Sequence, residues 1–139
     1  MKKILWSMMI FLFVGCSTPV SKTELENLNG YWEIEKVTFA NGETKNYKIN
    51  TVIDYIELKN LKGFRKKMQP KFDGSYTTSN DTEFFSIVET DGSFELHYKT
   101  EMSEWEERIL RISQNSFSVI NEDTLTYTYK RFQPIKVNE

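Results

Sequence analysis

Residues 93–100, SFELHYKT, alternate apolar and polar side chains almost without interruption. Such alternation is typical of a β-strand that buries one face and exposes the other. Asp91-Gly92, directly before it, is a hairpin turn signal, so the preceding strand is expected to pair with it antiparallel. The expected inner face consists of Phe94, Leu96 and Tyr98, and the outer face consists of Glu95, His97 and Lys99.

Similar short patterns recur along the chain on both sides of this segment. No long helical pattern separates them, which excludes parallel βαβ units. Short links favour antiparallel neighbours, and a meander of about eight strands loses its edges most easily by closing into a barrel. The expected fold is therefore an all-β antiparallel barrel. The expected strands are 31–39, 52–58, 63–68, 82–90, 93–100, 104–112, 115–120 and 125–132, with 72–78 either a short strand or a loop.

Two local expectations concern the start of this meander. Residues 22–29 are expected to form one or two helical turns, with Thr23 and Glu26 as a capping box. In the strand that follows, simple alternation places Trp32 on one face and Val37 on the other.

The glycine and tryptophan at the start of the first strand carry a family resemblance. Gly30 and Trp32 resemble the G-x-W of lipocalins, and the meander over roughly residues 28–132 is similar to theirs. In that family the tryptophan closes the barrel floor and an arginine of the last strand packs across it. The resemblance implies a lipocalin-like barrel in which Arg131, on the same face as Tyr129, lies on Trp32.

The N-terminal sixteen residues have the pattern of an export signal. Lys2 and Lys3 precede an apolar run, 4–14, that is too short for a permanent membrane span of about 20 residues but suits a signal peptide. The stretch 13–16, FVGC, resembles the lipobox of bacterial lipoproteins, where processing cuts before the cysteine and its thiol carries the lipid. The resemblance implies a lipid anchor on Cys16 and a place in the cell envelope, with the outer membrane as the expected membrane. The alternative is a buried thiol in a core helix.

Composition bounds the classes of partner. Removal of 15 of the 139 residues leaves 124, enough for one domain, with 16 Lys and Arg against 20 Asp and Glu. This mild acidity argues against nucleic acid as a partner. Cys16 is the only cysteine, which excludes an intrachain disulfide and a thiolate metal site. The expected organisation is a removed signal at 1–15, a lipidated cysteine, tether and short helix at 16–29, a barrel at 30–133 and a tail at 134–139.

The expected ligand-binding candidates are aromatic. They either line a pocket for a small apolar ligand or simply pack as core. The set consists of Trp32, Phe94, Tyr98, Tyr127 and Tyr129.

A basic cluster is the other candidate contact. Arg65, Lys66 and Lys67, with Lys62 and Lys71 nearby, either touch an anionic group or form the solvated face of an edge strand.

The remaining polar candidates are expected to be ordinary surface residues without a catalytic or metal-binding role. His97, the only histidine, is expected at the surface rather than as a catalytic base, and no catalytic residue, cofactor or metal site is expected. The acidic group is expected to be a solvated hairpin tip rather than a cation site. It consists of Glu101, Glu104, Glu106 and Glu107.

Two functions of different class are open, and neither is enzymatic. One is a membrane-anchored envelope lipoprotein that binds a small apolar ligand in its barrel. The other is a protein-interaction module, an assembly factor or hydrolase inhibitor, that uses the loops 41–50 and 66–81. An open cavity lined by aromatics favours the first, and a filled barrel with a protruding loop favours the second.

The lipid anchor is directly testable by Cys16→Ser. Because the thiol is the acceptor of the lipid, the variant is expected to lose the mass of a diacylglyceryl group and to leave the membrane fraction or stay uncleaved. Intact-mass spectrometry of fractionated cells measures both. A variant that still fractionates as a mature lipid-modified species contradicts the assignment.

Overall fold

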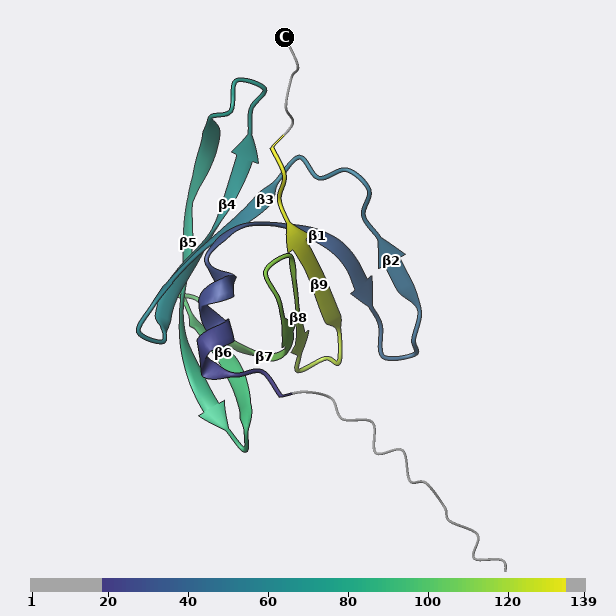
Figure 1. The fold of residues 1–139 in the computed structure, drawn as a ribbon, viewed down its shortest axis with the longest axis vertical. Coiled ribbons are helices and arrows are strands. Elements are labelled where there is room, and N and C mark those ends of the chain that lie inside the picture. The colour runs from purple at the N-terminus through teal and green to yellow at the C-terminus, as the bar shows by residue number, and fades with distance from the viewer. Residues whose placement is uncertain (1–18, 135–139) are drawn as a thin grey trace, which may run out of the picture.

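The computed structural model describes residues 19–134, so the signal, Cys16 and the last five residues lie outside the described part. Within it, no helix is long and apolar enough to cross a membrane. Nine strands follow a short 3-10 helix (Figure 1). The elements are η1 (Lys22–Leu28), β1 (Gly30–Thr38), β2 (Thr44–Asn46), β3 (Ile53–Lys59), β4 (Lys62–Pro70), β5 (Tyr76–Thr90), β6 (Ser93–Lys99), β7 (Glu104–Ile112), β8 (Ser116–Asn121) and β9 (Thr126–Arg131).

Eight of the strands close into one barrel. The strand order is β1-β3-β4-β5-β6-β7-β8-β9, every described pairing is antiparallel, and β9 pairs back onto β1. The predicted all-β antiparallel barrel is thus confirmed. The extra strand, β2, pairs only with the far end of β1 and stands outside the barrel (Figure 1).

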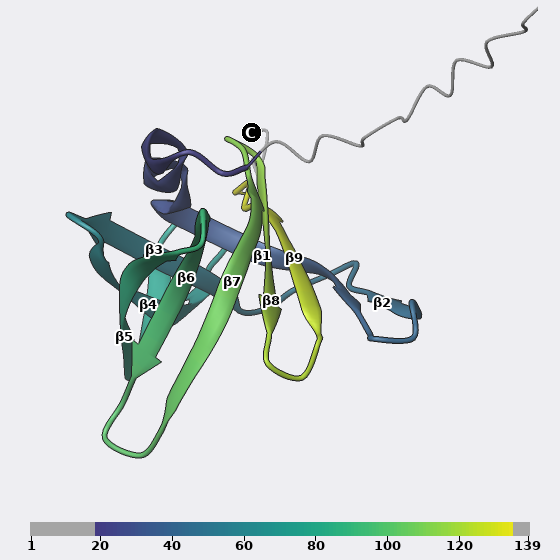
Figure 2. The same cartoon turned by 90° about the horizontal axis from the view of Figure 1, so that it is seen from below.

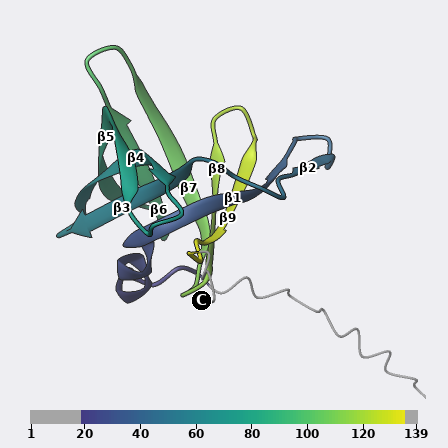
Figure 3. The ribbon, with the colours of Figure 1, turned by 90° about the horizontal axis from the view of Figure 1, so that it is seen from above.

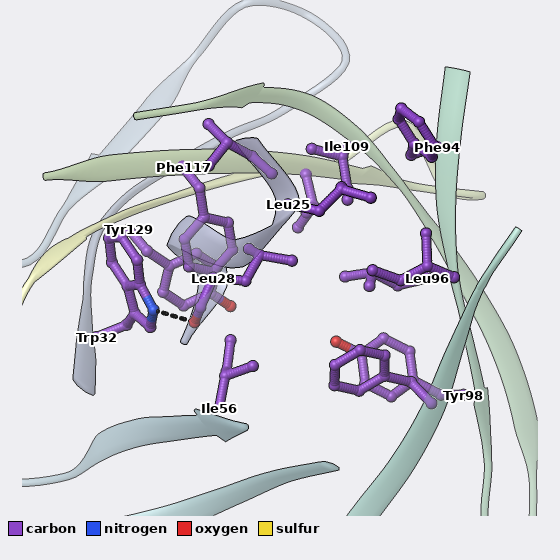
Figure 4. Packing of buried hydrophobic residues seen from close by; sticks show 14 residues of the cluster. Leu25, Leu28, Trp32, Ile56, Phe94, Leu96, Tyr98, Ile109, Phe117 and Tyr129 are labelled. Carbon is purple, nitrogen blue, oxygen red and sulfur yellow. Dashed lines mark hydrogen bonds between the residues drawn. The ribbon is translucent and has the colours of Figure 1, made fainter. Parts of the chain in front are cut away.

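The barrel has a closed end and an open end. Figures 2 and 3 show η1 at one end, and the β6–β7 and β8–β9 turns projecting at the other. At the closed end, Leu25 and Leu28 of η1 are buried among the inner side chains of the strands (Figure 4). Apolar side chains therefore fill this half of the barrel. The core cluster consists of Leu25, Leu28, Trp32, Ile56, Phe85, Ile87, Phe94, Leu96, Tyr98, Ile109, Ile112, Phe117, Val119 and Tyr129.

Trp32 and Arg131 lock the closed end together, as the lipocalin resemblance implies. Trp32 is fully buried, and its Nε1 donates to the Leu28 carbonyl at 2.8 Å (Figure 4). The Arg131 guanidinium lies 3.8 Å from the centre of the indole. It donates to the carbonyls of Asn27 (2.9 Å), Asn29 (2.6 Å) and Gln114 (2.9 Å).

Gly30 is required by this arrangement. Its φ is +122°, and a Cβ added there would lie 2.6 Å from Arg131 Nη1. Any larger residue would strain the backbone and push the guanidinium away from Trp32. This gives a physical reason for the glycine two positions before the tryptophan.

Three local expectations are wrong, each for a backbone reason. A bulge between Ile34 and Lys36 reverses the alternation of β1, so Val37 is buried inside the barrel with Trp32. The helix begins after Ser21, whose N–H donates to the Glu24 carboxylate at 3.1 Å, so the capping box is not at Thr23. The strand expected over 82–90 begins earlier, because β5 runs unbroken over 76–90 and includes the end of the segment 72–78, of which only 72–75 form a turn.

The long β5 is held by backbone pairing rather than by a side-chain pattern. Its polar first half pairs with Met68–Pro70 of β4 after a register shift, and its second half pairs with β6. The distal β4–β5 hairpin consequently projects beyond the barrel (Figure 1).

Arg131→Lys tests the closure at the barrel floor. An ammonium cannot lie flat on the indole while reaching three carbonyls, so the free energy of unfolding is expected to fall by about 2 kcal/mol. Urea unfolding measures the loss, and Arg111→Lys on the exposed side of β7 is the matched control. Equal stability of the two variants would contradict the role given to Arg131.

Candidate functional site

Charged side chains point into the barrel near its open end. Alternation along the strands places them there: Arg65 lies across from Ile56, Asp54 is two residues before Ile56, and Glu107 lies across from Leu96. The exposed fractions of Arg65, Asp54 and Glu107 are only 7%, 4% and 8%. Three ionisable groups thus occupy positions where alternation would otherwise place apolar residues.

Arg65 is the centre of this network. Its Nη2 donates to Asp54 Oδ2 at 3.1 Å, and its Nη1 donates to the Tyr98 hydroxyl at 3.4 Å. The same Nη1 lies 3.9 Å from Glu107 Oε1, longer than a hydrogen bond. The guanidinium also lies 4.8 Å from the centre of the Tyr129 ring. The arginine is therefore held by one close carboxylate and two aromatic side chains.

Asp54 and Glu107 respond oppositely to this setting. Burial raises the pKa of Asp54, but the charge and hydrogen bonds of Arg65 and Lys67 outweigh burial, so the net pKa lies below its ordinary value. Lys67 Nζ lies 2.7 Å from Asp54 Oδ1. For Glu107, burial prevails over the attraction of Arg65 and the Tyr98 hydroxyl, and its pKa is raised.

The two tyrosines stay protonated. Burial raises the pKa of Tyr129 to about 12, and it raises the pKa of Tyr98 further. Both phenols therefore remain hydrogen-bond donors at neutral pH.

A hollow of about 230 Å³ lies directly beside the charged network. One wall is Trp105, which stacks on Tyr98 with ring centres 5.0 Å apart and planes 7° apart. The hollow combines charged groups with aromatic faces, which suits a small molecule that has both a polar group and an apolar body. Its lining consists of Arg65, Lys67, Glu83, Trp105, Glu107, Asn121, Tyr127 and Tyr129.

The five aromatic candidates do not form one site. Trp32 and Phe94 are packed in the apolar core, with exposed fractions of 0% and 5%. Tyr98 is buried beneath the network and reaches Arg65 with its hydroxyl. Tyr127 and Tyr129 do line the hollow at the mouth. The sequence pattern found the inner face correctly but could not say where along the barrel a space would remain.

The basic cluster also divides. The expectation that Arg65 shares an exposed surface with Lys66 and Lys67 is wrong, because β4 alternates and turns Arg65 into the barrel. Lys66 points outward and lies over the Phe64 ring at 5.3 Å. Lys67 stands at the rim, paired with Asp54. Closure of the sheet also means that β4 is not an edge strand.

The acidic group divides in the same way. Glu107 is buried inside the barrel, so it is not part of a solvated hairpin tip. Glu106 is on the outer face, where its Oε1 lies 3.4 Å from His97 Nδ1, while Glu95 Oε2 lies 3.0 Å from His97 Nε2. Each carboxylate thus faces a different nitrogen of the half-exposed histidine, and the Glu95 carboxylate shares a hydrogen bond with Nε2.

A second, apolar groove lies outside the barrel. It measures about 320 Å³ and is formed by residues 49–51, the distal β4–β5 hairpin 69–76, Phe132 and Pro134. Ile49 and Phe72 beside it are each 88% exposed. Residues 49–50 and 69–76 of this lining belong to the two loops, 41–50 and 66–81, that the sequence marks as a contact surface.

Comparison with known proteins shows likeness in shape only. No family model matches the chain, and no curated protein matches it. A lipocalin-like protein from Bacteroides uniformis is 14% identical, with a TM-score of 0.48, over 76% of this chain and 99% of its own. An uncharacterized protein from Bacteroides eggerthii is 8% identical, with a TM-score of 0.47, over the same shares. At these values neither likeness supports an inference about what this chain binds.

The charged network should give two variants opposite dependences on pH. Asp54 stabilises the fold when ionised, so this contribution is present above its unfolded pKa and is lost as pH falls through the lower folded pKa. Asp54→Asn leaves Arg65 buried without its close partner and is expected to cost about 3–5 kcal/mol at pH 7, with the penalty shrinking in acid.

Glu107→Gln should behave in the reverse sense. Because the folded pKa of Glu107 is raised, its ionisation costs stability as pH rises from the unfolded pKa through the folded one. The stability of the variant relative to the native protein should therefore improve between pH 4 and pH 8. Urea unfolding across pH 2–8 measures both variants, and stability differences that do not change with pH would contradict the two assignments.

Proposed function

We propose that this protein is a non-catalytic binding protein of the cell envelope, anchored through Cys16, whose barrel mouth takes a small ligand. The observation that carries the proposal is the hollow of about 230 Å³ beside Arg65, Asp54 and Glu107. Small eight-stranded barrels can hold one small ligand at an open end. The signal sequence and lipobox support the place in the envelope, and they are features of the sequence alone.

The position of the hollow changes the expected chemistry of the ligand. The closed half of the barrel is occupied by packed side chains, with Trp32 and Phe117 among the largest that are fully buried. The hollow at the mouth is lined by both charged and aromatic residues. A small molecule with a polar group suits this site better than the purely apolar ligand expected from the aromatic pattern.

A second function is favoured by the outer groove. A solvent-exposed Phe72 and Ile49 flank an apolar hollow on a hairpin that projects from the barrel. Exposed apolar groups gathered on loops are typical of protein contact sites. In this alternative the barrel is a scaffold, and the β4–β5 hairpin binds another envelope protein.

Trp105→Ala tests the mouth as the ligand site. The full-length lipoprotein is purified in mild detergent from its membrane fraction, and small molecules are released with solvent and identified by mass spectrometry. Trp105 lines the hollow, so its removal should lower the amount of co-purified compound at least tenfold. Phe84→Ala is the matched control, because Phe84 is an exposed aromatic, 61% accessible, outside the hollow.

The same preparation separates the two functions. A compound retained by the native protein and by Phe84→Ala, but lost from Trp105→Ala, supports binding at the mouth. Identical small-molecule contents in all three proteins contradict it. If a photo-crosslinker at Phe72 then captures one defined envelope protein, the interaction module replaces the first proposal.

A further inference from the structure

At the mouth, by which we mean the open end of the barrel with its hollow, some charged side chains have close partners of opposite charge and others do not. Both cations that line the hollow are committed to one carboxylate: Arg65 Nη2 lies 3.1 Å from Asp54, and Lys67 Nζ lies 2.7 Å from it. Each oxygen of Asp54 thus has a cation nearby, although Oδ1 makes no hydrogen bond of regular geometry and is held by the Lys67 charge alone. An incoming anion would have to compete with Asp54 for both of these partners, which makes the mouth a poor anion site.

Two further carboxylates, those of Glu83 and Glu107, have no cation as close as this among the described residues, although the Tyr98 hydroxyl donates to Glu107. Glu107 is 92% buried by residue area, and its closest ion-pair contact among the described residues is 3.9 Å. Glu83 sits across from Arg65 on β5, yet the described part of the chain gives it no ion pair within 4.0 Å. Both line the hollow, and the charge of Glu83 is one cause of the raised pKa of Glu107. The site therefore carries negative charge that a ligand could neutralise.

Aromatic faces stand beside these carboxylates. Trp105 and Tyr127 line the hollow, and Trp105 already uses one face to stack on Tyr98. Indole and phenol faces attract cations, and the attraction strengthens where water is partly excluded. Carboxylates together with aromatic walls are the usual surroundings of a bound ammonium group, whereas an anion would be repelled by both.

We infer that the ligand of the mouth is a small organic cation: an amine whose ammonium group pairs with Glu107 and Glu83 and whose apolar body lies against Trp105 and Tyr127. The hollow of about 230 Å³ limits the ligand to a small molecule, such as a single-ring amine. This inference rests on the proposed function and adds the charge and size of the ligand to it.

Calorimetric titration with three matched probes tests the sign of the charge. The probes are phenethylamine, neutral 2-phenylethanol and anionic phenylacetate, each added to the purified full-length protein at pH 7.5. Phenethylamine is expected to bind at least tenfold more tightly than the other two. Glu107→Gln should weaken phenethylamine binding at least tenfold and should leave the binding of 2-phenylethanol unchanged.

Glu106→Gln is the matched control. Glu106 is the neighbour of Glu107 in sequence but lies on the outer face of β7, with its side chain 49% exposed beside His97. Its variant should bind phenethylamine as the native protein does. Because Glu106→Gln and Glu107→Gln remove the same charge, a general electrostatic effect would weaken binding equally in both variants and would overturn the assignment of Glu107.

The outcomes distinguish failure of this inference from failure of the proposed function. If phenylacetate binds more tightly than phenethylamine, the ligand is not a cation, but the mouth remains the ligand site. The same holds if an anionic or neutral compound co-purifies in a Trp105-dependent way. Equal affinity of phenethylamine for the native protein and Glu107→Gln also overturns the inference of a cation. If no probe binds and no compound depends on Trp105, both proposals fall together.

Discussion

The contact between Arg131 and Trp32 is the interaction on which the closed barrel depends. One guanidinium covers the indole face and donates to carbonyls from the end of η1 and from the β7–β8 turn. It thereby fixes the last strand, the first strand and the capping helix relative to one another. At the same end, Trp32 Nε1 donates a hydrogen bond to the Leu28 carbonyl of η1. These hydrogen bonds connect η1 to the barrel that it covers.

Closure at one end determines where polar groups can gather. Leu25 and Leu28 enter the barrel from η1, and the large side chains of β1, β8 and β9 fill the space above them. Figure 4 shows this packing as a continuous cluster that includes Phe117 and Tyr129. Charged residues on the inner faces can therefore be accommodated only toward the open end, where their charged groups lie next to the hollow. Arg65, Asp54 and Glu107 occupy that end.

The sequence predicts the fold well because the barrel follows simple alternation over most of its strands. The inner face of 93–99 and the link between Trp32 and Arg131 could be inferred from parity and from the G-x-W resemblance. Val37 could not be placed, because the bulge after Ile34 changes the backbone without changing the pattern of residue types. The continuity of β5 was likewise hidden, because backbone pairing with β4 holds its polar half.

The candidate site was harder to predict, because its charged residues resemble surface residues. Arg65 begins a basic run directly after Phe64, a large apolar residue that faces outward, so hydrophobicity at this point indicates the wrong face of β4. The alternation of inward and outward residues in β3 and β7 does indicate two of the buried charges. Asp54 shares its alternation with Ile56, and Glu107 shares its own with Ile109, so two carboxylates fall on inner faces. Buried carboxylates need a cation, and the next strand after Asp54 supplies Arg65.

Stability alone is a weak reason for this network to exist. Buried ion pairs lose solvation on folding, and well-packed apolar residues of similar volume often stabilise a fold as well or better. The closed half of the barrel shows that this chain can fill its interior with apolar side chains. Glu107 makes the argument stronger, because its ionised form opposes folding and its nearest cation is 3.9 Å away. A buried carboxylate whose ionisation opposes folding and that lies beside a hollow with aromatic walls fits the proposed binding site better than a purely structural role.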